Sequence, residues 1–470
     1  MAGAIGLAIT AHAASSSPAE SPELGLAPLK VSGNKHFLVQ EDGKPFFYLA
    51  DTAWGLFPDA TPADVDFYLN DRAEKGFTVI QAVVILWDAS RHTDYNGQLP
   101  FAGNDPAKPN EAYFKNVDTV IDKAQALGLR MALVPFWFKG LRNNIPGLLD
   151  PAMAQAFCKY LGARYRDKAV IWILGGDTAG NSRRGPDYAP LARAMAAGLR
   201  AGDGGAHLIT YHPTGQQSSS MWFQSEPWLD FDLLQSGHLI QNTNYELIAH
   251  DYASTPVKPV IDGEPGYENI TDHLISIQRH PDAKRIDAQD VRRFGYLSVF
   301  AGAAGHTYGN GEVFGFWNPG TGGEPRWGSG MPWRQSMELP GSFQMQYLRK
   351  LIESRPMLAR IPDQNLIIGD TLETTTRLEG TRAADGSYAF IYTSAGEPIQ
   401  ARLQLLAGDT IRAYWYDPRT GTPTLIGDIP KTPARTFTPP GKGGGNDWVL
   451  VLDNAAANYP APGSARAIEN

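Results

Sequence analysis

Short apolar runs alternate with amphipathic segments between about residues 45 and 310, and this alternation limits the possible folds more than any other feature. The first four runs are almost wholly apolar, as parallel strands buried on both faces must be. Most runs stop at Gly, Pro, Asp or Trp. We predict strands at 46–51, 79–85, 130–136, 170–176, 208–213, 233–238, 259–264 and 305–309.

The segments between these runs have helical periodicity and recognisable ends. Thr61 is a plausible N-cap with Pro62 at the first helical position, and Gly128 is placed to end the next helix. Eight strand–helix alternations over ~250 residues are what a (β/α)8 TIM barrel requires. A doubly wound open sheet is the main alternative, but no G-x-G-x-x-G motif follows the first strand.

The pattern changes after the helix predicted at 342–356, which would be the eighth of the barrel. Short alternating runs follow, separated by turn sequences such as Asp-Gly and Arg-Thr-Gly, and this spacing predicts a small antiparallel β-sandwich domain. The chain is therefore predicted to be α/β, with two folded domains. The expected parts are a leader at 1–27, the barrel at 28–357, the sandwich at 358–455 and a tail at 456–470.

The first residues resemble a secretory signal. A short apolar stretch leads to Ala11-His12-Ala13 and then to a Ser/Pro/Glu-rich spacer, which is the order of a signal peptide and its cleavage site. The positively charged start of such signals is missing, because no Lys or Arg precedes Lys30. We expect a secreted or periplasmic protein.

Several partner classes are excluded by composition and motif. The net charge is −8, Lys and Arg are scattered, and no RRM, helix-turn-helix or zinc-finger spacing occurs, so we expect no nucleic-acid partner. No later stretch approaches the ~18 apolar residues of a membrane span. C-x-x-C, H-E-x-x-H and P-loop patterns do not occur in the sequence, so we expect no bound metal and no cofactor. The oligomeric state cannot be read from the sequence.

Polar and aromatic residues gather where the predicted strands end. In a (β/α)8 barrel these C-terminal strand ends carry the active site. Chance does not readily place so many such residues on one rim, so the rim is the candidate site. Its members are Asp51, Trp54, Trp87, His92, Trp137, Asp177, His212, His238, Glu264, Tyr267, His306, Tyr308 and Trp317.

Two of these carboxylates suggest a reaction. Asp177 follows the fourth predicted strand behind two glycines, and Glu264 ends the seventh, roughly across the barrel. Two carboxyl groups in an aromatic-lined groove fit glycoside hydrolysis. One must donate a proton to the leaving oxygen, and the other must be ionised to attack or stabilise an oxocarbenium-like centre. The expected partner is a carbohydrate substrate.

The chain also resembles the apiosidase-like glycoside hydrolases from about residue 28 to 453. The stretches that carry the resemblance are LADTAW (49–54), VIWILGGD (170–177), HPTG (212–215), QSGH (235–238), DGEPGYE (262–268) and HTYGN (306–310). This resemblance implies a retaining mechanism with Asp177 as acid/base and Glu264 as nucleophile, acting on a terminal apiose-like furanoside of plant-type glycans. Most members of the wider clan carry Asn-Glu where this chain has Gly176-Asp177.

The remaining rim residues are predicted to bind substrate. Asp51 could take two sugar hydroxyls, and His212 and His238 could contact hydroxyls or Glu264. Trp54, Trp87, Trp137 and Trp317 could form stacking walls. Two alternatives stay open: an endo-acting β-glycanase of the same barrel clan, and a non-catalytic carbohydrate- or collagen-binding protein.

Overall fold

The structure is a computed structural model. It describes Met1 and residues 26–86, 93–140, 145–181, 187–272, 284–320 and 328–464. Predictions on most of the leader, on Trp87 and His92, and on the end of the tail lie outside the described residues.

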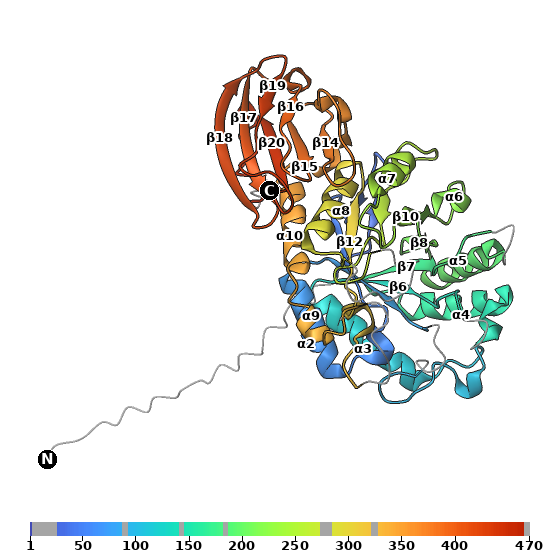
Figure 1. Ribbon diagram of the computed structural model, residues 1–470. Helices are drawn as coiled ribbons and strands as arrows, with labels where there is room; N and C mark the ends of the chain where they lie inside the picture. The colour runs from blue at the N-terminus through green and yellow to red at the C-terminus, as the bar shows by residue number, and fades with distance from the viewer. Residues whose placement is uncertain are drawn as a thin grey trace.

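A nearly closed parallel barrel forms the larger part of the molecule (Figure 1). Its sheet order is β8-β7-β6-β5-β4-β12-β11-β10, and the short β9 (Gln217–Ser218) adds antiparallel to β10. The eight parallel strands are β4 (Tyr48–Thr52), β5 (Val79–Val83), β6 (Arg130–Val134), β7 (Val170–Gly175), β8 (Ile209–His212), β10 (Asp232–Gln235), β11 (Val260–Asp262) and β12 (Gly305–Tyr308). All eight coincide with predicted strands, and the (β/α)8 prediction is confirmed.

The two ends of this series meet and close the barrel. Asp230 N donates to Ile209 O at 2.9 Å, and Thr210 Oγ1 donates to Phe231 O at 2.7 Å. These bonds join the approach to β10 with β8, although no regular ladder connects the two strands. The C-terminal strand ends therefore face one common rim.

Helices cover the barrel, and their ends follow the local signals. The longer ones are α2 (Pro62–Glu74), α3 (Glu111–Ala126), α4 (Pro151–Arg164), α5 (Ala189–Asp203), α7 (Asn244–Tyr252), α8 (Ala288–Phe300) and α10 (Pro340–Glu353). Thr61 caps α2 in a capping box with Asp64, and Gly128 has φ 80° just after α3, as predicted. Short helices are α1 (Leu56–Asp59), α6 (Ser220–Phe223) and α9 (Trp333–Ser336).

Antiparallel strands make up the C-terminal part. A six-stranded sheet has the order β13 (Arg360–Pro362), β14 (Leu378–Ala383), β15 (Tyr388–Thr393), β20 (Trp448–Asn454), β17 (Thr410–Asp417) and β18 (Thr422–Pro430). A two-stranded sheet of β16 (Ile399–Ala401) and β19 (Arg435–Phe437) adds to its core. At the other end of the chain, β1 (Lys30–Val31), β2 (Leu38–Val39) and β3 (Pro45–Phe46) form a small sheet.

Both faces of the six-stranded sheet are buried in its central strands. Figure 1 shows this sheet beside α8 and α10. On one face Tyr392 stacks on Tyr296 of α8 with ring centroids 5.0 Å apart, and Phe390 lies 5.9 Å from Phe300. On the other face Ile391 belongs to the separate apolar core that includes β16 and β19. Residues therefore alternate between the two cores, and the sheet is packed directly onto the barrel.

A buried ion pair also joins the two parts. Arg292 of α8 binds Asp447 through two parallel bonds, Nε to Oδ2 at 2.9 Å and Nη2 to Oδ1 at 2.7 Å, and its Nη1 donates to Gln344. Neither charged side chain is accessible to a significant extent. Charges held in this way depend on each other, because removing one leaves the other unpaired and out of water.

Replacing Arg292 by Met should therefore lower the free energy of unfolding by about 3–5 kcal/mol. Urea denaturation followed by fluorescence would measure the change. Arg412→Met is the matched control, because Arg412 makes the same forked pair with Asp428 at 2.8 and 2.9 Å but at the exposed surface. The free energy of unfolding should fall much less in the control, and equal falls in both variants would contradict the importance of burial for the Arg292–Asp447 pair.

Candidate active site

Asp177 and Glu264 meet at the rim. Asp177 lies two residues beyond β7 and Glu264 two residues beyond β11. One oxygen of each carboxylate and one ring nitrogen of His212 lie within 4.8 Å of one another. Two strand ends separated by 87 residues of sequence thus bring their carboxyl groups together.

An unusual turn presents Asp177. Gly175, Gly176 and Asp177 have φ values of 88°, 117° and 51°, so three consecutive residues adopt conformations that side chains disfavour. A Cβ at Gly176 would lie 2.5 Å from Cδ2 of Trp137. Glycine is therefore needed for the chain to pass against this indole, and Asp is among the few residues that tolerate the third position.

Glu264 is held between two imidazoles. Nε2 of His212 lies 2.8 Å from its Oε2, and Nε2 of His238 lies 3.1 Å from its Oε1. Burial opposes ionisation of this carboxyl, but its contacts with the two histidines outweigh burial and lower the pKa of Glu264. Glu264 is therefore an ionised carboxylate in a site from which water is largely excluded.

The hydrogen-bond partner of Nδ1 in each ring indicates which ring nitrogens carry a proton. Nδ1 of His238 accepts from the Tyr267 backbone N–H at 3.3 Å, so its proton is on Nε2 and is donated to Glu264. Nδ1 of His212 lies 3.0 Å from the Pro213 carbonyl and must donate to it. Its Nε2 lies at ion-pair distance from the Glu264 carboxylate, and an imidazole protonated on both nitrogens, an imidazolium, suits these two acceptors. Burial lowers the pKa of His212, but the contact with Glu264 and its charge raise it by more.

Asp177 has different surroundings from Glu264. Its side chain keeps 27% of its surface exposed, and Lys139 Nζ lies 3.3 Å from Oδ2. The pair is thus asymmetric: a buried carboxylate faces one that solvent and a leaving group can reach. Lys139 follows the end of β6, and a lone Lys in a loop gives no signal in the sequence.

Aromatic side chains surround the histidines. The ring centroids of Trp54 and Trp137 are 5.0 Å apart, and His212 lies 5.7 and 5.0 Å from them. Tyr267 packs at 4.5 Å against His238. Because both indoles are only 3% exposed, they support the imidazoles rather than form an open stacking surface.

Three residues predicted to bind substrate point elsewhere, which corrects the prediction. The fully buried Asp51 accepts from Tyr68 Oη at 2.5 Å and from Arg72 Nε at 2.6 Å, both on α2. Tyr308 donates to Glu268 at 2.7 Å. His306 is buried against α8, and burial lowers its pKa to about 3. All three side chains lie on the outer face of their strands, between the sheet and the helices.

The other predictions have mixed outcomes. Trp317 lies in the loop after β12, where its N–H donates to Glu312 O at 3.1 Å, and its contact with substrate stays a prediction. Trp87 and His92 lie outside the described residues. Gln81 of β5 was missed: its Nε2 donates to Gly263 O at 2.9 Å, which fixes the backbone just before Glu264. A buried Gln in an apolar strand was the signal that could have found it.

The same cluster could also hold a metal ion. Within the described part of the chain, Asp177, His212 and Glu264 are the only group of three His, Cys, Asp or Glu side chains close enough to share one. An ion there would compete with the proton on His212 for the Glu264 carboxylate. The cluster is therefore either a metal site or an acid–nucleophile pair, and chelation distinguishes the two.

Comparison with known proteins places the chain in a family. The model of the apiosidase-like catalytic domain matches residues 32–359. The chain belongs to the apiosidase-like family. A second model, the putative collagen-binding domain of a collagenase, matches residues 361–453. A search of curated protein sequences finds no match.

Solved structures support the assignment to glycoside hydrolases. A glycoside hydrolase family 5 protein from Bacteroides vulgatus is 31% identical with a TM-score of 0.86, covering 94% of this chain and 97% of its own. A second structure, described as a glycoside hydrolase, is 31% identical with a TM-score of 0.84 over 92% and 98% of the two chains. This apiosidase-like chain is thus a glycoside hydrolase with a TIM barrel. No helix among its described residues is long and apolar enough to cross a membrane.

The protonated His212 predicts a pH dependence. The folded protein binds this proton more tightly than the unfolded chain, in which His212 has the ordinary histidine pKa of 6.5. The stabilisation is therefore complete below about pH 6.5 and is lost as the pH rises through the folded-state pKa. Unfolding free energies of the wild type should fall as the pH rises above about 6.5, and His212→Gln should lack that part of the slope. Parallel slopes in both proteins would contradict the assigned imidazolium.

Proposed function

We propose that the protein is a retaining glycoside hydrolase, with Glu264 as nucleophile and Asp177 as acid/base. The observation that carries the proposal is the spacing of their carboxylates, which have oxygens within 4.8 Å of one another. Retaining enzymes need carboxyl groups ~5–5.5 Å apart, whereas inverting enzymes need ~6.5–9.5 Å to admit a water molecule between them. The short spacing supports direct attack by Glu264.

The proposed reaction has two steps. The Glu264 carboxylate attacks the anomeric carbon as the glycosidic bond breaks, and Asp177 gives its proton to the departing oxygen. Asp177 then takes a proton from water, which attacks the same carbon and releases Glu264. Throughout, His212 and His238 orient Glu264, because each imidazole contacts one of its two carboxylate oxygens.

The proposed substrate is a terminal apiose-like furanoside of a plant-type glycan. Its support is membership of the apiosidase-like family. We also propose that the protein is exported, on the strength of its signal-like first residues. Amino-terminal sequencing of the protein recovered from the periplasm or the medium would test export.

Stereochemistry and specificity test the function. A panel of aryl β-glycosides, including the β-apioside, should identify the sugar, and proton NMR of the first product should show retention of the β configuration. Inverted product would overturn the roles of the two carboxylates. Dialysis against EDTA should leave the rate unchanged, whereas loss of activity that a divalent ion restores would favour the metal site.

A further inference from the structure

A cavity of about 510 Å³ lies where the barrel rim meets the C-terminal sheet domain. One wall is the segment after β11 with the start of α8, and a second is the start of α10. The third is a glycine-rich loop at 441–446 that connects β19 to β20. The lining includes Asn269, Arg285, Ile286, Gln289, Pro340 and Gly444. Its volume is within the ~300–1,000 Å³ of small-molecule sites.

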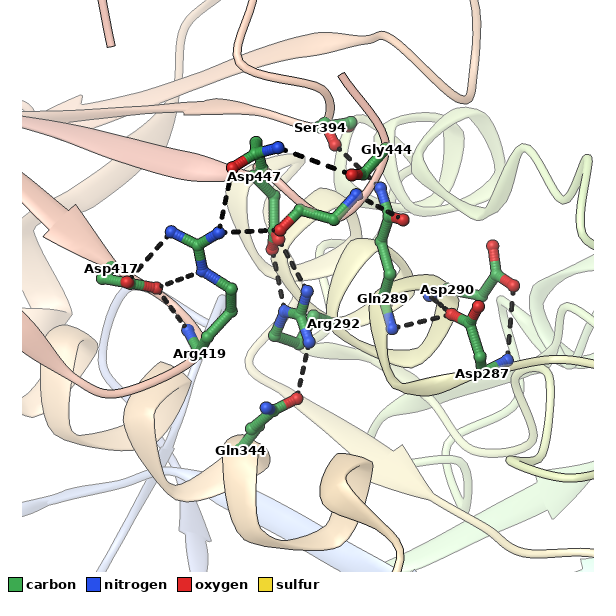
Figure 2. Close-up of polar contacts among 12 residues, drawn as sticks. Asp287, Gln289, Asp290, Arg292, Gln344, Ser394, Asp417, Arg419, Gly444 and Asp447 are labelled. Carbon is green, nitrogen blue, oxygen red and sulfur yellow. Dashed lines mark hydrogen bonds and ion pairs between the residues drawn. The ribbon is translucent and has the colours of Figure 1, made fainter. Parts of the chain in front are cut away.

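The glycine-rich wall is fixed from two sides. Gln289 of α8 accepts from Gly445 N at 2.7 Å, and Arg419, in the turn after β17, donates to Gly445 O at 2.8 Å. Figure 2 shows these contacts beside the Arg292–Asp447 pair, which holds α8 against β20. The cavity is therefore preformed by bonds that cross between the two parts of the chain.

The cavity adjoins the nucleophile through rigid backbone. Glu268, which lines it, is four residues after Glu264, so their Cα atoms are at most about 14 Å apart. Glu268 N donates to Gly309 O and its own carbonyl accepts from Gly311 N, both at 2.9 Å. These bonds continue the pairing of β11 with β12 beyond the barrel, so the catalytic rim and the cavity wall are one structure.

The chemistry of the lining favours an uncharged ligand. The lining has two acids and two arginines, so its charges balance. Glu268 is already bonded to Tyr308 and Arg292 is already paired with Asp447. Leu339 and Pro340 supply apolar surface. Beside them are the amides of Asn269 and Gln289, which are held in place by Ser329 and by Gly445. Apolar surface with a few fixed hydrogen-bonding groups suits a sugar ring, whose faces are apolar and whose edges carry hydroxyls.

We propose that this cavity binds the uncharged, remote part of the glycan whose terminal sugar lies between Asp177 and Glu264. The proposal rests on the proposed function and extends it. The C-terminal domain then completes a substrate site by supplying its glycine-rich wall. This role accounts for a sheet that is packed on the barrel rather than tethered to it.

A bulky side chain at Gly444 tests the cavity. A Cβ there would lie 3.9 Å from Gln289 Oε1 with no closer neighbour, so Gly444→Trp extends a ring into the cavity without a backbone clash. Gly444→Ala leaves the cavity open, and Lys442→Trp puts the same bulk on an exposed position of the same loop. Each full-length variant is assayed on two substrates: an aryl glycoside of the sugar found by the screen, and the same sugar carried by a neutral tetrasaccharide.

Gly444→Trp should lower kcat/KM for the extended substrate about tenfold, through KM, while the aryl glycoside changes less than about twofold. Both controls should behave as wild type. An unchanged ratio between the two substrates in Gly444→Trp would overturn the proposal. The proposal would also be overturned if Gly444→Trp lost binding to a triple-helical collagen peptide while the ratio between the two substrates stayed the same.

Binding separates this proposal from the catalytic one. Calorimetric titration of Glu264→Gln with neutral cello-, xylo- and manno-oligosaccharides should show binding that the added Gly444→Trp removes. If the wild type cleaves no glycoside, the proposed function fails, but this titration still shows whether the cavity binds an oligosaccharide. Equal binding with and without Trp at position 444, or no binding of any oligosaccharide, would overturn it.

Discussion

Glu264→Gln should lower kcat on the best aryl glycoside by about 10³-fold or more, with the protein still folded. The amide removes the negative charge that we propose attacks the anomeric carbon, yet it keeps the size of the side chain. It also keeps an oxygen that can accept from His238, which lies 3.1 Å from the present carboxylate. Initial rates with a nitrophenyl glycoside, together with Tm, measure the two effects separately.

Glu379→Gln is the matched control for this substitution. Glu379 is also a buried glutamate, but it pairs with Arg377 at 2.7 Å in the C-terminal sheet, far along the chain from the rim. Its replacement should leave kcat near that of the wild type, whatever it costs in stability. A Glu264→Gln enzyme with activity comparable to this control would rule out Glu264 as the nucleophile.

The sequence was sufficient to find the carboxylate pair because both acids follow buried strands. A parallel strand in a barrel places its last residues at one rim, so strand order and strand ends locate Asp177 and Glu264 before any coordinates exist. The two histidines follow the same rule, because His212 ends β8 and His238 lies three residues after β10. The prediction that they could contact Glu264 is confirmed by contacts of 2.8 and 3.1 Å.

The sequence could not tell which way a residue within a strand points. Side chains alternate between the barrel interior and the helix layer, and both environments are apolar in a parallel barrel, so pattern alone does not separate them. Three predicted residues lie near the C-terminal ends of their strands, but their side chains are on the outer face of the barrel sheet: Asp51, His306 and Tyr308. Asp51 is explained by two residues of α2: Tyr68, 17 residues later, donates to it at 2.5 Å, and Arg72, 21 residues later, binds it at 2.6 Å.

Other features depend on parts of the chain that only the fold brings together. Lys139 lies 3.3 Å from Asp177 because the fold places the two on neighbouring strand ends. The cavity beside the rim joins residues after β11 to Gly444, more than 150 residues away. Turn-rich glycine sequence predicted a loop there, but a loop's neighbours follow from domain packing, which leaves no periodic trace in the sequence.

The turn that holds Asp177 accounts for how far this carboxylate reaches, where the resemblance to the wider clan leads us to expect a Glu. Three consecutive positive φ angles turn the chain inward behind β7, and Trp137 occupies the space that a Cβ at Gly176 would need. The carboxylate consequently reaches within 4.8 Å of Glu264 although the side chain is one methylene shorter. Backbone conformation, and not side-chain length alone, sets the reach of this carboxylate.

Asp177→Asn should therefore slow both steps, and the second step should be the more informative. With a nitrophenyl leaving group, which departs without a proton, the glycosyl-enzyme still forms, but water attacks it without a base. We expect kcat to fall by about 10²–10⁴-fold, and KM to fall with it as the intermediate accumulates. Added azide, which needs no base, should restore turnover and give the β-glycosyl azide, identifiable by mass spectrometry and NMR.

Two further variants make the result specific to this position. Asp150→Asn is the matched control, because Asp150 caps α4 by accepting from Met153 N at 2.9 Å and Asn caps equally well. Asp177→Glu keeps the acid but overshoots the reach set by the turn, so it should also lose activity, without rescue by azide. An Asp177→Asn enzyme that azide does not accelerate would show that another group serves as base, and Lys139, 3.3 Å from the present carboxylate, would be the next residue to replace.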